Sequence, residues 1–137
     1  MWWIYALLAA LFAALTAIFA KIGLKDVPSD LATAIRTVVI LLVAWGVAFF
    51  RGETQGISLI SKQGLLFLVL SGLATGLSWL FYFRALQLGK VSQVAPVDKL
   101  SLVLVIIFSV IFLNEPLTWK MLLGGLLIVG GTIILIL

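Results

Sequence analysis

The chain has 137 residues and a net charge of +4; 64% of its residues are hydrophobic and only 10% are charged. A typical soluble domain has roughly 25% charged residues, because polar groups must cover its water-facing surface. A chain this apolar would expose large hydrophobic patches in water and aggregate. The composition therefore excludes a soluble enzyme and indicates a protein embedded in a lipid bilayer.

The basic residues are spread along the chain rather than gathered. The nine lysines and arginines occur mostly singly between apolar runs. A nucleic-acid-binding protein would collect them in a stripe or patch. Isolated basic residues beside apolar segments are typical of anchors at the membrane surface. We expect the bilayer as a partner and no nucleic acid.

The chain contains neither cysteine nor histidine. Their absence removes disulfides, thiolate and imidazole metal sites, and nucleophile pairs built on these residues. Among the acidic residues, only Asp26 and Asp30 lie close together at helical spacing, and they fall in a turn beside Lys25, which argues against a paired-carboxylate acid–base site. We therefore expect no catalytic residue, no metal and no cofactor.

Five apolar segments are long enough to cross a bilayer, since about 20 helical residues span its hydrocarbon core. We predict an all-α integral membrane protein, a bundle of five transmembrane helices forming a single domain over 1–137, without an internal repeat. The expected helices cover 2–21, 31–50, 64–83, 93–113 and 117–137.

Sequence features mark the ends of these helices. Trp2, Trp3 and Tyr5 form an aromatic belt at the start of the first helix. Pro28 prevents the first helix from continuing into the second, and Asp30 is expected to cap the second helix. Two longer polar loops are expected over 51–56 and 84–92.

The fourth helix departs from a regular span. Pro96, Asp98 and Lys99 fall in its first two turns. Proline removes a backbone hydrogen bond, and charges are costly within a membrane. We expect this helix to be kinked or shortened at that end.

Three charged residues lie within the predicted spans. We call the face that holds the N-terminus side A and the opposite face side B. Arg36 and Asp98 lie at matching depth, roughly 8–9 Å below side B at 1.5 Å per residue, with Lys99 beside them. One interpretation is that Arg36 and Asp98 face each other and form a polar site at the mouth of the bundle. The other is that Arg36 and Lys99 extend to the membrane surface while Asp98 caps a kinked helix end.

Other residues are candidates for a central cavity or for close helix packing. Hydroxyl and aromatic side chains are the candidates for the substrate pathway beside the three charged residues: Thr16, Thr37, Thr75 and Trp79. Small residues let helix backbones approach closely in lipid. Glycines at packing spacing are candidates for contacts within the bundle or between subunits: Gly72, Gly76, Gly124 and Gly131.

Two stretches resemble a known family. Residues 81–101 (FYFRALQLGKVSQVAPVDKLS) and 112–119 (FLNEPLTW), followed by a glycine-rich last helix, are similar to the signature of EamA domains in the drug/metabolite transporter superfamily. Most members of that superfamily have ten helices from two such domains, and this chain resembles the single-domain, five-helix bacterial and archaeal group. The resemblance implies an EamA-like half-transporter of the inner (cytoplasmic) membrane. It also implies efflux of a small metabolite, amino acid or drug-like substrate by alternating access.

An odd number of spans has a consequence for assembly. A second copy must be inverted to build the inverted repeat of many transporters, so we expect a homodimer, with antiparallel dual topology left open. The loops of side B carry four basic residues against three on side A, a weak orientation bias. These are Lys21, Lys25, Arg84 and Lys90 on side B, and Arg51, Lys62 and Lys120 on side A. Counting Arg36 and Lys99 favours side B in the cytoplasm.

One departure from a related group and two alternative functions remain at this point. The related small multidrug resistance proteins carry a carboxylate in helix one, but the matching position here falls near Ala13, which puts their proton-coupled mechanism in doubt. The superfamily also includes flippase subunits for lipid-linked substrates. A non-transporting accessory subunit would need a larger partner chain.

Overall fold

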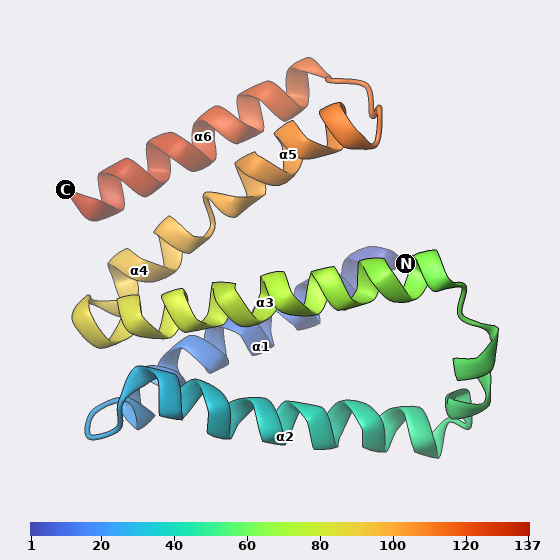
Figure 1. Cartoon of the computed structure of the whole chain (residues 1–137). Helices are drawn as coiled ribbons and strands as arrows, with labels where there is room; N and C mark the ends of the chain where they lie inside the picture. Colours follow the sequence, from blue (N-terminus) through green and yellow to red (C-terminus); the bar gives the residue numbers. More distant parts are fainter. The chain divides into compact units, whose positions relative to one another are not determined.

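The computed structural model describes all 137 residues and contains helices and short connections but no strand (Figure 1). Five segments are long and apolar enough to cross a membrane, which confirms the predicted all-α, five-span fold. They are α1 (Trp2–Gly23), α2 (Ser29–Phe50), α3 (Lys62–Leu88), α4 (Val91–Asp98) with α5 (Ser101–Phe112), and α6 (Trp119–Ile136).

The chain divides into two compact units. Residues Ala20–Gln87 form one, called here the central unit, and Met1–Phe19 with Leu88–Leu137 form the other, the terminal unit. The central unit contains α2 and most of α3, whereas the terminal unit contains most of α1 and all of α4, α5 and α6. Each unit is described by itself.

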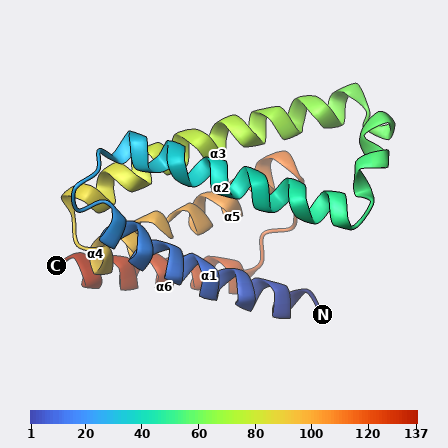
Figure 2. The same cartoon turned by 90° about the horizontal axis from the view of Figure 1, so that it is seen from below.

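In the central unit, α2 and α3 run antiparallel and are joined by a short 3₁₀ helix, η1 (Glu53–Leu59), as both views show (Figures 1 and 2). Gly52 enters η1 with φ of 70°, a left-handed conformation that suits glycine. The segment expected to be an irregular polar loop is therefore largely helical.

Two helix ends of the central unit differ from the prediction. Helix α2 begins at Ser29, with Pro28 as its N-cap, so Asp30 lies in the first turn and does not cap the helix. Its charge still faces the positive end of the helix dipole. Helix α3 continues to Leu88 because nothing in 84–88 breaks a helix before Gly89. Arg84 donates to Gln87 Oε1 across one turn of this extension.

The best-buried hydrophobic residues of the central unit lie just after α1 and at the end of α3. Leu24, Phe83 and Leu86 are 3%, 2% and 0% exposed. Lys21 Nζ donates to the carbonyl of Leu86, and Gln87 Nε2 donates to the carbonyl of Val27 at 3.1 Å. These contacts fasten the end of α1 and the connection that follows it to the end of α3. This end of the unit, on side B, is therefore its firmly packed end.

In the terminal unit, the fourth span is broken into α4 and α5 between Asp98 and Ser101, as expected from Pro96. The backbone tightens before the break: the Lys99 amide donates to the carbonyls of both Ala95 and Pro96, and the Leu100 amide to that of Val97. Such short-range bonds replace the regular helical pattern at a helix end. The predicted kink is confirmed as a break.

Helix α6 packs against both parts of the broken span. A turn containing Asn114, with φ of 53°, reverses the chain after α5. The hydroxyl of Thr118 accepts a hydrogen bond from the Met121 amide and caps the helix. Helix α6 thus begins at Trp119, slightly later than the expected start.

Candidate functional site

The central unit holds a cationic side chain over aromatic rings within its spans. The guanidinium carbon of Arg36 lies 4.4 Å from the centroid of the Trp79 ring and 5.0 Å from that of Phe83. Arg36 projects from α2, and the two rings project from α3. Trp79 and Phe83 are four residues apart, so they lie on the same side of their helix. The sequence-predicted candidates Arg36 and Trp79 are therefore brought together.

Arg36 has an unusual set of partners for a charged residue in a membrane span. It forms no ion pair and no hydrogen bond in the structure; it contacts the two rings and interacts electrostatically with Tyr82. Ring faces attract a cation by about 0.5–2 kcal/mol, more where water is excluded. A guanidinium stacked by its face keeps the N–H groups of its edge available. The cluster therefore stabilises the charge without occupying its hydrogen-bond donors.

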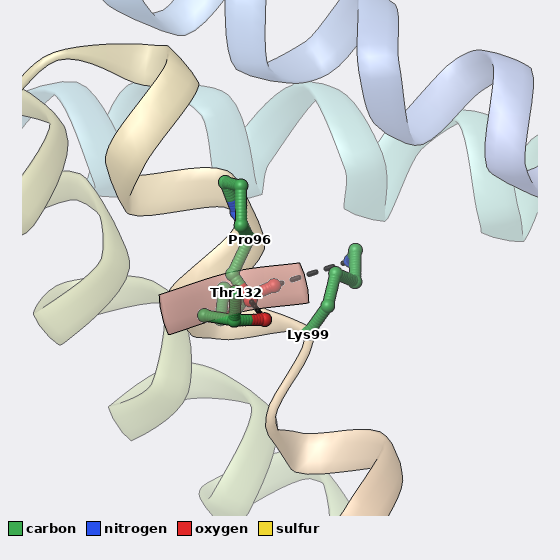
Figure 3. A network of polar contacts seen from close by, with 4 residues as sticks. Pro96, Lys99 and Thr132 are labelled. Atoms are coloured by element: carbon green, nitrogen blue, oxygen red, sulfur yellow. Dashed lines mark hydrogen bonds and ion pairs between the residues drawn. The ribbon is translucent and has the colours of Figure 1, made fainter. Parts of the chain in front are cut away.

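The terminal unit holds a second polar group at the broken span (Figure 3). Lys99 Nζ and Asp98 Oδ2 form an ion pair at 3.2 Å, with side chains 55% and 33% exposed. Thr132 of α6 is 5% exposed, and its hydroxyl donates to the carbonyl of Pro96 at 3.3 Å. Gln93 Nε2 of α4 donates to the carbonyl of Ile136, which lies one helical turn after Thr132 in α6. Both side-chain bonds link α4 with α6.

The predicted pairing of Arg36 with Asp98 joins residues of different units and stays a prediction. Asp98 is instead seen in the ion pair with its neighbour Lys99. Phe83 was missed as a partner of Arg36. It lies one helical turn from Trp79 at the end of the same span, but a ring face that holds a cation has no distinctive sequence signal.

The hydroxyl candidates already make hydrogen bonds within their helices or have none shown. Thr37 donates to the carbonyl of Thr33 at 2.7 Å, and Thr75 to that of Ser71 at 2.8 Å. Thr16 is half-buried on α1, in the terminal unit. Their roles as pathway residues stay predictions.

Open space surrounds the candidate glycines. A Cβ added at Gly72, Gly76, Gly124 or Gly131 would meet no atom within 4 Å. By contrast, one added at Gly125 would lie 4.0 Å from Ile106 of α5. Contacts made by the first four, within the bundle or with another subunit, stay predictions.

Two hollows lie on the units. In the central unit, an open hollow of about 600 Å³ lies between α2 and α3 beside η1, and its lining includes Ala44, Ala48, Leu68 and Glu53. In the terminal unit, a groove of about 310 Å³ runs between α5 and α6 and is lined by apolar residues and Gly125. Glu53, in the hollow of the central unit, is the only charged residue that lines either of these two hollows.

Five apolar spans, one of them broken, and a cation held between two spans define a multi-pass membrane protein with a charged group inside its spans. The family model for EamA-like transporters matches residues 1–137, and the chain belongs to that family. This confirms the resemblance read from the sequence and points to a transporter rather than an enzyme.

Two relatives cover nearly the whole chain. An uncharacterized transporter encoded in the cobO 3′ region of a Sinorhizobium species is 54% identical over 134 residues, which is 98% of this chain and 95% of the relative. An uncharacterized protein of Methanocaldococcus jannaschii is 27% identical over 132 residues, covering 96% and 93% of the two chains. No solved structure matches the chain.

Proposed function

We propose that this protein exports a small metabolite, amino acid or drug-like compound across the cytoplasmic membrane, as a homodimer working by alternating access. The observation that carries the proposal is the position of Arg36 within a membrane span, over Trp79 and without an acidic partner in its unit. Ionisable residues inside spans are costly and mark substrate pathways by default. Family membership supports the transport class.

The homodimer follows from the number of spans. Two copies of a five-span chain that insert in opposite orientations together form an inverted repeat. Inverted repeats form the central site of many transporters. The weak bias of basic residues between the two faces is compatible with insertion in both orientations. The broken α4–α5 span supports the same mechanism, because discontinuous helices commonly border transporter sites.

Single-cysteine labelling tests the antiparallel dimer. The chain has no cysteine, so Gln55→Cys on side A and Asp26→Cys on side B each introduce a unique thiol. Both residues are exposed, and neither replacement removes a basic residue that sets orientation. Gln87 is less suitable, because its side chain is bonded to Val27.

An impermeant thiol reagent applied to intact cells should label both variants in comparable fractions, and permeabilised cells give the total for each. Labelling of one variant alone would show a fixed orientation and overturn the antiparallel homodimer. If Gln55→Cys alone is labelled, side B is cytoplasmic and a partner chain is required.

A lipid-linked substrate is a second candidate, favoured by the apolar groove between α5 and α6. An acyl chain fits such a surface, whereas a polar metabolite does not. This candidate predicts that a lipid-linked analogue protects the protein against thermal unfolding more strongly than free small molecules do.

A further inference from the structure

The partners that Arg36 lacks indicate what it binds. A guanidinium carries five N–H donors; those of Arg36 make no hydrogen bond in the structure, and the polar side chain that acts on its charge is that of Tyr82. Unmet donors of a charged group are costly in a membrane segment, where water is scarce. The acceptor that matches this planar fork is a carboxylate or phosphate bound through two oxygens.

The side of α3 that carries the rings faces open space next to them. Gly76 and Gly72 lie one and two helical turns before Trp79 on the same side of the helix, and neither has an atom within 4 Å of an added Cβ. Farther toward side A, Leu68 of this side meets Ala44 and Ala48 of α2 around the open hollow. An apolar group attached to the anion would find room here.

We propose that Arg36 is an oxyanion site and that the exported substrate is a monocarboxylate with a short apolar body. The carboxylate binds the edge of the guanidinium, and the apolar body lies beside Trp79 along the glycines of α3. This inference rests on the proposed transport function and names the substrate class for the same site. A phosphate at the same edge could come from a lipid headgroup, so the test includes that source.

Acid and amide pairs separate charge from shape. Purified protein in neutral detergent is titrated with phenylacetate, 3-phenylpropionate and isovalerate, and with the primary amide of each. The midpoint of thermal unfolding reports binding, because a ligand of the folded state stabilises it by mass action. We expect at least one acid to raise the midpoint saturably while its amide has no effect.

Variants then locate the site. Arg36→Gln should weaken binding of that acid about tenfold or more, since a bidentate charged pair is lost. Arg36→Lys keeps the charge but not the fork and should fall between the two. Arg51→Gln is the matched control: Arg51 is exposed beyond the end of α2, and its loss should leave binding unchanged.

The outcomes are distinct. Equal binding of acid and amide, or unchanged acid binding in Arg36→Gln, overturns the oxyanion site but leaves small-molecule transport standing. Absence of stabilisation by all three acids overturns the substrate class. Phosphatidylglycerol is titrated in the same way as the lipid source of phosphate. If only this lipid stabilises the protein, and only when Arg36 is present, Arg36 is a lipid anchor and the proposal is wrong. The acid–amide comparison uses the unaltered chain, so it decides even if Arg36→Gln fails to fold.

Discussion

The hydroxyl of Thr132 donates to the carbonyl of Pro96 at 3.3 Å and joins the last helix to the broken fourth span (Figure 3). Proline lacks an N–H and weakens the helix around it, so carbonyls near the break need other donors. Thr132 is 5% exposed, which places this bond in the interior of the terminal unit. The break is therefore a supported feature of the fold.

Removing that hydroxyl should destabilise the protein modestly. Thr132→Val keeps the shape of the side chain but cannot donate, and we expect a loss of about 0.5–1.5 kcal/mol in the free energy of unfolding. Thr37→Val is the control, because the Thr37 hydroxyl donates within its own helix to the carbonyl of Thr33. Equal losses for the two variants, measured by denaturant unfolding in micelles, would contradict a supporting role for the Thr132 bond.

The stacking of Arg36 on Trp79 predicts an energetic coupling between the two residues. Trp79→Leu should destabilise the protein, and part of that loss, about 0.5–2 kcal/mol, should vanish when Arg36 is already glutamine. Trp79→Phe retains a ring face and should lose less.

Trp45→Leu supplies the control for that cycle, because no cation lies over its ring. A coupling near zero between Arg36 and Trp79, or one no larger than that between Arg36 and Trp45, would show that the contact does not stabilise the charge.

Asp98 has two candidate partners, and a second cycle distinguishes them. Its ion pair with Lys99 is half-exposed, and such pairs contribute about 0–1 kcal/mol. Matching depth makes Arg36 the other candidate, but a carboxylate held there would occupy the donors that the proposed oxyanion site needs. We therefore expect the Arg36–Asp98 coupling to be no larger than the Lys99–Asp98 coupling when both are measured by unfolding of the single and double variants.

The same cycle has a functional readout. A carboxylate of Asp98 at the guanidinium would compete with a substrate carboxylate, and none is expected there, so Asp98→Asn should leave binding of the acid found in the titrations unchanged. An Arg36–Asp98 coupling larger than the Lys99–Asp98 coupling, with stronger acid binding in Asp98→Asn, would show that Asp98 pairs with Arg36 and would contradict an open oxyanion site.

The spans and the break could be predicted because their causes are local. Apolar length determines which segments cross the bilayer, and Pro96 lies in the sequence at the place where the fourth span is disrupted. The end of α3 was placed too early because Arg84 was treated as a boundary. A charged residue does not end a helix when neighbouring side chains can hydrogen-bond to it. Here Gln87 Oε1 accepts a hydrogen bond from Arg84.

The partner of Arg36 could not be predicted from charge alone. Counting residues from side B put Arg36 and Asp98 at one depth, and opposite sign made Asp98 the natural choice. Trp79 lies near that depth as well, but a ring face as the partner of a cation has no distinctive sequence signal. Which helices are neighbours depends on tertiary packing, and the contact between α2 and α3 became visible only in the structure.

The proposed oxyanion site requires that a carboxylate reach Arg36 through the open space beside the glycines of α3. A cysteine at Gly76 tests it directly, since the added side chain meets no atom within 4 Å and faces the same side of α3 as Trp79. Ala74→Cys is the matched control on the opposite side of α3 at nearly the same depth. Thiols react as thiolates, which require water. We predict that a small hydrophilic thiol reagent modifies Gly76→Cys much faster than Ala74→Cys, and that an acid shown to bind slows the reaction. Equal slow rates at the two positions would mean that this space is closed to water and would contradict an oxyanion site at Arg36.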